Sequence, residues 1–176
     1  MGDPFDLQRF VDAQAPVYPR VLAELGHGRK QSHWMWFIFP QLAGLGHSAM
    51  ARRFAISSRE EAAAYLGHGI LGPRLRECTA LVNAVEGRTI LQILGSPDDL
   101  KFGSSMTLFA AVSSEPEFAA AIAKFCGGTP DQKTLTAKRN CDGHPALCAA
   151  ILFGVLLTIL RWSRTSSGLL FFKAAT

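Results

Sequence analysis

Charged side chains are scarce in this chain: Asp, Glu, Lys and Arg make up 18% of its 176 residues, against 48% for hydrophobic residues. So apolar a chain is not intrinsically disordered, and its length is typical of one compact globular domain. Cysteine is also rare, with four residues that lack the Cys-x-x-Cys or Cys/His pairing of a zinc site. We therefore predict a folded domain with reduced thiols, no metal and no cofactor.

A basic cluster on the body of the chain is missing as well, although the formal net charge is +4 and the pI is about 9.1. Residues 1–135 hold thirteen Lys/Arg and thirteen Asp/Glu, so the whole excess lies in residues 136–176. Binding to a nucleic-acid duplex needs several basic side chains on one face of the folded body. The distribution predicts no nucleic-acid partner.

The N-terminal residues Met1-Gly2-Asp3-Pro4-Phe5-Asp6 lack the basic and apolar regions of a secretory signal. This absence predicts a cytoplasmic protein, a compartment in which thiols stay reduced. The sequence leaves the oligomeric state open.

Start signals for helices recur along the first 135 residues. A helix N-terminus favours Ser, Thr, Asp or Asn as the cap, proline in the first turn, and acidic residues near the positive end of the helix dipole. Such signals occur at Asp3-Pro4, Ser58-Arg59-Glu60-Glu61, Gly72-Pro73, Ser96-Pro97-Asp98-Asp99 and Ser114-Glu115-Pro116-Glu117. We predict an all-α, or mainly α, fold: a compact single domain of short helices over residues 3–135.

Two of the three tryptophans stand in one stretch, Ser32-His33-Trp34-Met35-Trp36-Phe37-Ile38-Phe39-Pro40-Gln41, which we call the tryptophan segment. A stretch this apolar must be buried, while the polar groups at its ends stand at the rim of whatever it packs into. Because it has no strand-like partner of similar character, we predict a buried irregular or short helical conformation. Its candidate ligand-binding residues are His33, Trp34, Trp36 and Gln41.

A second group of candidates lies on the helix expected to begin at Pro97. Asp98, Lys101 and Ser105 share one face by their i, i+3 and i, i+4 spacing, with Ser104 adjacent. An acid, a base and a hydroxyl on one face can bind and protonate a small polar ligand. These three are therefore our candidate catalytic residues, and Ser104 is a candidate ligand-binding residue. Arg52, expected on a helix over residues 48–54, is a candidate anchor for a phosphate or carboxylate.

The same side chains also suit a purely structural role. Asp98 and Asp99 stabilise a helix N-terminus, Lys101 can pair with either carboxylate, and the serine hydroxyls can donate to backbone carbonyls. The sequence leaves both interpretations open.

Two further stretches stand out beside the tryptophan segment: Leu71-Gly72-Pro73-Arg74-Leu75-Arg76-Glu77-Cys78, and Gly95-Ser96-Pro97-Asp98-Asp99-Leu100-Lys101-Phe102 followed by Ser104-Ser105-Met106-Thr107-Leu108-Phe109. In this order, over about residues 3–135, the three resemble the motif blocks of an uncharacterised, mainly bacterial domain family of unknown function that is sometimes labelled calpastatin-like. The resemblance implies a small, mostly helical single domain and brings no established reaction. The label implies an intrinsically disordered protease inhibitor, which this apolar sequence cannot be.

Three classes of function remain open, and with them the question of whether the protein is an enzyme. The first is an enzyme or binding protein for a small nucleotide-like or sugar-phosphate ligand, with Trp34 and Trp36 as a stacking wall and Asp98 as acid or base. The second is a protein-interaction module whose exposed tryptophan surface is covered by a partner. The third is a membrane-associated protein. The first class requires the tryptophan segment and the Asp98–Ser105 face to border one hollow that is open to solvent.

The membrane hypothesis depends on residues 143–160, which carry no charge and are nearly all apolar from Ala146 onward. As a helix they would extend about 27 Å, just under the ~30 Å hydrocarbon thickness of a bilayer. We treat residues 136–176 as a divergent hydrophobic and basic tail with no catalytic role. The sequence leaves open whether this tail inserts in a membrane, packs on the domain or is a frameshifted C-terminus.

Overall fold

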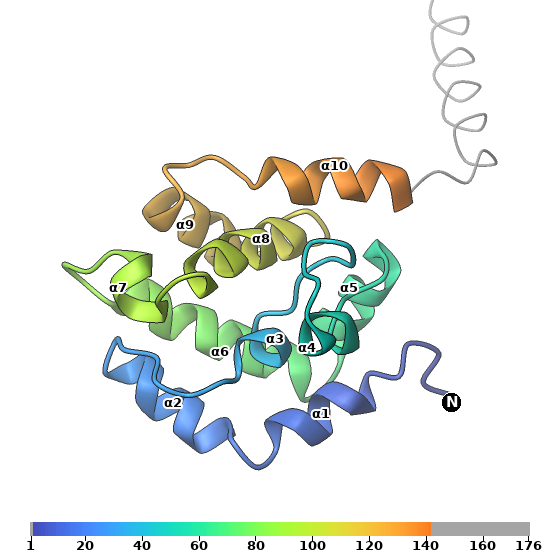
Figure 1. Cartoon of the computed structure of the whole chain (residues 1–176), viewed down its shortest axis with the longest axis horizontal. Coiled ribbons are helices and arrows are strands. Elements are labelled where there is room, and N and C mark those ends of the chain that lie inside the picture. The colour runs from blue at the N-terminus through green and yellow to red at the C-terminus, as the bar shows by residue number, and fades with distance from the viewer. Residues whose placement is uncertain (1, 142–176) are drawn as a thin grey trace, which may run out of the picture. The chain divides into compact units, whose positions relative to one another are not determined.

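The computed structural model describes residues 2–141, and this part of the chain forms ten helices (Figure 1). The helices are α1 (Gln8–Gln14), α2 (Tyr18–Gly26), α3 (Met35–Ile38), α4 (Ala49–Arg53), α5 (Arg59–Gly67), α6 (Leu71–Ala84), α7 (Ile90–Leu94), α8 (Asp98–Ala110), α9 (Pro116–Phe125) and α10 (Gln132–Cys141). Within residues 2–141, β pairing is limited to one isolated bridge between Leu42 and Ile56. The predicted all-α fold is confirmed.

Side-chain caps explain where some of the helices begin. The Ser48 hydroxyl accepts a hydrogen bond from the Ala51 N–H (3.1 Å) at the start of α4. At α7, Thr89 and Gln92 form a full capping box, in which each side chain accepts from the backbone N–H of the other residue. These bonds satisfy donors that the first turn of a helix leaves without an intrahelical partner.

The start signal Ser58-Arg59-Glu60-Glu61 has the pattern of a capping box, which forms only in part. The Ser58 hydroxyl accepts from the Glu61 N–H (3.2 Å), as predicted. The Glu61 carboxylate instead accepts from the backbone N–H and the hydroxyl of Ser57 (2.8 and 2.5 Å) and pairs with Arg9 (2.6 Å). Arg9 also donates to the Ala55 carbonyl (3.1 Å), so these bonds join α1 to the segment between α4 and α5.

One proline start and two whole helices differ from the prediction. Pro97 is the cap residue of α8 rather than its first helical residue, and no side chain caps α8. The proline start of α9 is confirmed, because Pro116 is its first residue, although the cap residue Glu115 makes no side-chain hydrogen bond. Two helices are not among those predicted: α7, which has only five residues, and α10, which follows a stretch typical of a turn and runs past residue 135 to Cys141.

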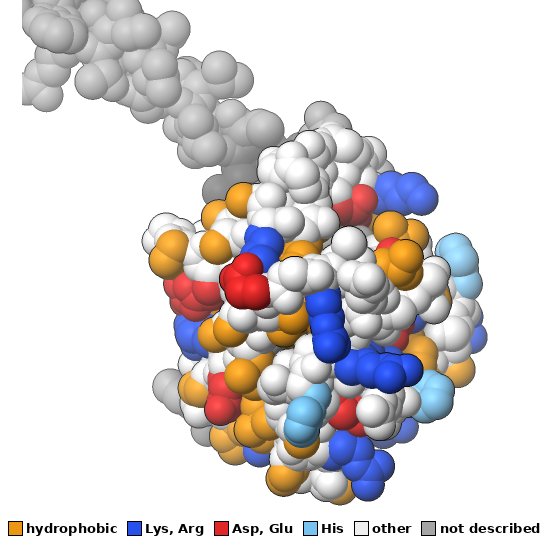
Figure 2. Space-filling model, turned by 90° about the vertical axis from the view of Figure 1, so that its left-hand side faces the viewer, with side chains coloured by type: hydrophobic (Ala, Val, Ile, Leu, Met, Phe, Trp, Pro, Cys, Tyr) orange, Lys and Arg blue, Asp and Glu red, His pale blue; other side chains and the backbone are white. Residues whose placement is uncertain are grey.

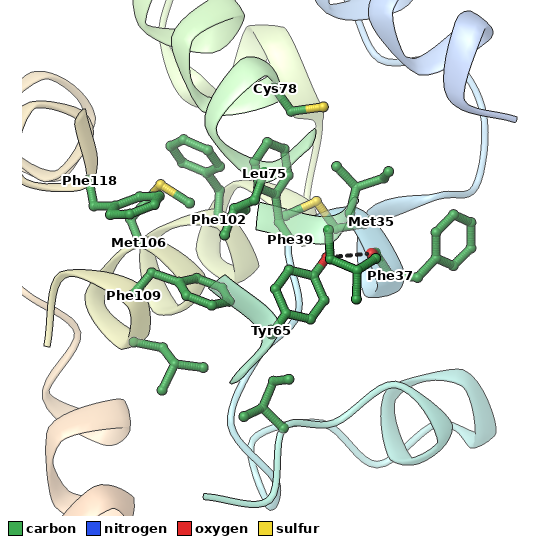
Figure 3. Close-up of a cluster of buried hydrophobic side chains, with 14 of the residues drawn as sticks. Met35, Phe37, Phe39, Tyr65, Leu75, Cys78, Phe102, Met106, Phe109 and Phe118 are labelled. Carbon is green, nitrogen blue, oxygen red and sulfur yellow. Dashed lines mark hydrogen bonds between the residues drawn. The ribbon is translucent and has the colours of Figure 1, made fainter. Parts of the chain in front are cut away.

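The core is built from aromatic side chains of several helices, and the tryptophan segment supplies many of them (Figure 3). Its α3 contacts α1 and α6, and Trp34, Met35 and Phe39 are almost completely buried. The Phe39 and Phe102 rings meet edge to face, with centroids 5.0 Å apart. Such pairs add specific geometry to the free energy that comes from burial of apolar area. The expected burial of this segment, in a short helical conformation, is thus observed.

One polar network crosses the core beside α3. The Tyr65 hydroxyl donates to the Phe37 carbonyl (3.2 Å; dashed line in Figure 3). The buried Gln14 amide donates to the same carbonyl (2.7 Å) and to the Tyr65 hydroxyl (3.0 Å). These bonds satisfy the Phe37 carbonyl, which the short α3 leaves without an intrahelical partner, and so favour its burial.

No helix among residues 2–141 has both the length and the apolar character needed to cross a membrane. The apolar stretch 143–160, on which the membrane hypothesis depends, lies outside the described residues.

Candidate functional site

The tryptophan segment meets the start of α8 at a group of paired charges. Asp98 accepts from two ammonium groups: Lys30 Nζ lies 2.7 Å from Oδ2, and Lys101 Nζ lies 2.7 Å from Oδ1. The Lys30 ammonium lies 5.3 Å from the Trp34 ring centroid, and that of Lys101 lies 4.9 Å from the Trp36 ring centroid. These are cation–π distances. The two regions selected from the sequence therefore do lie side by side.

This pairing holds Asp98 in its ionised form. Burial raises the pKa of Asp98, but the hydrogen bonds and charges of Lys101 and Lys30 outweigh burial and leave the pKa below its ordinary value. A general acid needs a pKa near the working pH. At neutral pH Asp98 is therefore a fixed negative charge between two lysines.

Trp34 is a core residue and does not form an exposed stacking wall. It is 1% exposed, and its indole N–H donates to Glu24 Oε2 (2.8 Å). Glu24 also accepts from the Gln31 N–H (2.8 Å), the Ser32 N–H (3.1 Å) and the Ser32 hydroxyl (2.5 Å). Burial raises the pKa of Glu24, but these hydrogen bonds outweigh it and lower the pKa from 4.5 to about 2. Glu24 thus anchors the entry to the tryptophan segment.

A cavity of about 620 Å³ lies beside this charge group, between the N-terminal half of α8 and the connection from α9 to α10. Its lining is completed by the loop after the tryptophan segment and by α7. The lining residues are Gln41, Leu45, Gly46, Ile90, Pro97, Asp99, Leu100, Lys101, Gly103, Ser104, Phe125, Cys126, Thr129, Asp131 and Lys133. This volume is in the range of about 300–1,000 Å³ that is typical of small-molecule sites.

Three of the residues selected from the sequence line this cavity: Gln41, Lys101 and Ser104. The others are not among its lining residues. Trp34 and Ser105 are buried in the core, Trp36 is half-buried beside Lys101, and His33 is exposed. Asp98 lies within the charge group described above. Arg52 is exposed on α4 and donates to the carbonyl of His47, which lies in the loop before this helix.

Ser105 does not share the face of Asp98 and Lys101. Its side chain is completely buried, and its hydroxyl has no hydrogen-bond partner among residues 2–141. The i, i+3 spacing does bring Asp98 and Lys101 together, as the sequence predicts. The helix turns Ser105 toward the core because α8 packs against α9, α7, α10 and α5, which leaves little of its surface free.

Asp131 connects α8 and α10 at the part of the cavity lining that follows α9. Its Oδ2 accepts from the Thr134 hydroxyl (2.6 Å), the Thr134 N–H (3.1 Å) and the Ser104 hydroxyl (2.8 Å). Burial raises the pKa of Asp131, but these hydrogen bonds outweigh it and leave the pKa below its ordinary value. Asp131 is therefore an ionised cap of α10 that holds this helix against α8.

The rest of the cavity wall combines apolar surface with a few polar groups. Burial raises the pKa of the Cys126 thiol, so Cys126 is protonated and a poor nucleophile at neutral pH. The ammonium group of Lys133 is exposed and makes no hydrogen bond or ion pair with any residue that the structure describes. Phe125, Asp131 and Lys133 are not among the residues selected from the sequence, because they lie in or next to the Gly- and Pro-containing connection between α9 and α10. The cap pattern Asp131-x-x-Thr134 is the signal that could have indicated α10.

Charges of both signs are interspersed with hydrophobic side chains on the face of the molecule that bears α7 (Figure 2). This mixture agrees with the balanced charge of residues 1–135. No group of three or more His, Cys, Asp or Glu side chains within residues 2–141 is arranged to hold a metal ion.

Comparison with known proteins gives one family and one solved structure. Residues 4–137 match a family described as a protein of unknown function (DUF1810). The chain is 60% identical to the conserved hypothetical protein Rv1873 from Mycobacterium tuberculosis, whose crystal structure superposes with a TM-score of 0.76. The match covers 77% of this chain and 97% of that one. No curated protein matches the chain.

Proposed function

Since the chain belongs to the DUF1810 family, whose description assigns no activity, we propose from the geometry of its cavity that it binds a small nucleotide-like or sugar-phosphate ligand. The cavity itself is the observation that carries this proposal. Its lining combines apolar side chains with two lysines, and a nucleotide combines a flat aromatic ring with an anionic phosphate.

The lysines supply the site for the anionic group. Lys133 is exposed and has a free ammonium group within the described part of the chain. Lys101 uses one N–H for Asp98 (2.7 Å) and keeps two donors, because an ammonium carries three. Hydrogen bonds between ammonium and phosphate are charge-assisted and therefore stronger than neutral ones.

The aromatic surface of the cavity comes from Phe125 instead of the tryptophans. Phe125 is half-buried and packs against Phe102, with ring centroids 6.2 Å apart. This contact fixes the position of the Phe125 ring. Ile90 and Leu100 add aliphatic surface to the lining. A planar ring placed on these side chains would bury apolar area on binding.

The geometry favours binding over hydrolysis. Asp98 does not line the cavity, and the pKa of both Asp98 and Asp131 is lowered, so neither is protonated at neutral pH. Hydrolysis by general acid catalysis needs a carboxyl group with a raised pKa. An interaction module based on exposed tryptophans has less support, because Trp34 is buried and Trp36 is half-buried.

Calorimetric titration of the full chain with adenosine 5′-monophosphate, adenosine, ribose 5-phosphate and inorganic phosphate tests this proposal. We expect the nucleotide to bind and Lys133→Ala to weaken it about tenfold, which corresponds to one lost charge-assisted bond. The affinity for adenosine should not change, because it has no phosphate.

Arg20→Ala is the matched control, because it removes an exposed cation of α2 that does not line this cavity. It should leave the affinity for the nucleotide unchanged. The cavity is not the ligand-binding site if none of the four compounds binds, or if Arg20→Ala weakens binding as much as Lys133→Ala does.

A further inference from the structure

The side chain of Gln41, the last residue of the tryptophan segment, lines the cavity and is half-buried. Its carboxamide makes no hydrogen bond with any residue that the structure describes, and neither its oxygen nor its nitrogen is shielded from solvent. By contrast, the Ser104 hydroxyl donates to Asp131 (2.8 Å), and Lys101 donates to Asp98 (2.7 Å). Gln41 therefore offers an accessible donor and acceptor to whatever occupies the cavity.

The backbone on both sides of Gln41 is held in place by tertiary contacts. The Gln41 carbonyl accepts from the Ile56 N–H (2.9 Å), and the Ala43 N–H donates to the Ile56 carbonyl (2.8 Å). These two bonds form the isolated β bridge between Leu42 and Ile56. Pro40 and Leu42 are both buried. A side chain on a backbone fixed in this way presents its amide to the cavity from a defined position.

Stability alone does not account for a glutamine at this position. Its amide makes no hydrogen bond within the described part of the chain, and its two neighbours in sequence are apolar and buried. An apolar side chain would suit a half-buried position better, because partial removal of an amide from water without a partner costs free energy. Residues that serve binding are often retained at such a cost in stability.

We propose that Gln41 determines the specificity of the cavity and that the ligand is an adenine nucleotide. A carboxamide carries an acceptor oxygen beside donor N–H groups, and it forms a bidentate pair with N6 and N7 of adenine, which are a donor and an acceptor. Guanine presents two acceptors on the same edge, so the amide oxygen would face another acceptor. This inference depends on the proposed function and narrows it to one base.

Each part of an adenine nucleotide then has its own partner in the cavity lining. Gln41 binds the edge of the base, Phe125 packs against its face, and Lys101 and Lys133 bind the phosphate. Binding displaces water from the Gln41 amide. An analogue without the 6-amino group leaves the amide oxygen unpaired, and a site that recognises a hydrogen-bonding group strongly rejects analogues that lack it.

Calorimetric titration of the full chain with adenosine 5′-monophosphate, purine riboside 5′-monophosphate and guanosine 5′-monophosphate tests the inference. The purine riboside nucleotide differs from the adenosine nucleotide only in lacking the 6-amino group. We expect adenosine 5′-monophosphate to bind at least about tenfold more tightly than either of the other two.

Gln41→Met replaces the carboxamide by an apolar side chain of similar length. We expect it to abolish the difference between the adenosine and purine riboside nucleotides. The melting temperature without ligand should not fall, because the removed amide has no partner in the described part of the chain. Gln31→Met is the matched control, because Gln31 is an exposed glutamine outside this cavity. It should leave all three affinities unchanged.

The titrations also distinguish the inference from the proposed function. If the unmodified chain binds either analogue as tightly as adenosine 5′-monophosphate, the role of Gln41 is refuted and the binding site stands. The inference is also overturned if Gln41→Met keeps the tenfold difference, or if it lowers the melting temperature and weakens all three nucleotides equally. If none of the three binds, both proposals are wrong.

Discussion

Replacing Glu24 by glutamine is expected to lower the free energy of unfolding at pH 7 by about 2–4 kcal/mol, the cost of disrupting a buried, charge-assisted network. The Glu24 carboxylate accepts four hydrogen bonds, one of them from the Trp34 indole. A glutamine side chain has one acceptor oxygen, and its amide group would face donors where the second carboxylate oxygen now lies. Urea unfolding followed by tryptophan fluorescence measures the loss.

The same substitution is expected to change the pH dependence of stability. The pKa of Glu24 is lowered from 4.5 to about 2, so the stabilisation it provides is complete above pH 4.5 and is lost as the pH falls toward 2. The difference corresponds to about 3 kcal/mol. Unfolding free energies measured between pH 7 and 2 should therefore fall more steeply for the unmodified chain than for Glu24→Gln.

Glu86→Gln provides the control for both measurements. Glu86 pairs with Lys124 at the surface, where its side chain is 85% exposed, and such pairs contribute about 1 kcal/mol or less. If Glu24→Gln and Glu86→Gln have equal effects at pH 7, the hydrogen bonds to Glu24 do not stabilise the tryptophan segment.

A methyl group at Gly72 is expected to destabilise the fold by about 2–4 kcal/mol, near the upper end of the usual cost of overpacking. A Cβ at this position would lie 2.0 Å from the Leu66 carbonyl oxygen and 2.9 Å from its carbon. Because this obstacle is backbone, α5 and α6 would have to move apart. Alanine has a helix propensity only about 1 kcal/mol more favourable than that of glycine. The cost of the clash is larger, so we expect a net loss of stability. Thermal unfolding of Gly72→Ala followed by circular dichroism tests this.

Gly67→Ala is the matched control in the same connection. A Cβ at Gly67, the last residue of α5, would meet nothing within 4 Å. We expect this substitution to be neutral or slightly stabilising. Unchanged stability of Gly72→Ala would mean that the close approach of α5 and α6 is not required.

The cavity could be predicted only in part, because its walls come from segments that are far apart in the chain. Lys101 and Ser104 lie on a helix that the local sequence indicates, and Gln41 ends a segment that had to be buried. Phe125, Asp131 and Lys133 come from the connection between α9 and α10, and no local pattern relates that connection to α8. The sequence also cannot show that Lys30 pairs with Asp98, since no spacing rule links them.

The amino-acid sequence by itself determined the helical class, the approximate starts of α4, α5, α6, α8 and α9, and the burial of the tryptophan segment. Caps, dipole charges and apolar content act within a few residues, so they can be interpreted locally. Only the tertiary structure decided which way each side chain faces. Trp34 and Ser105 point into the core while Asp99 borders the cavity, because packing between helices distant in the sequence determines which surface of each helix remains free.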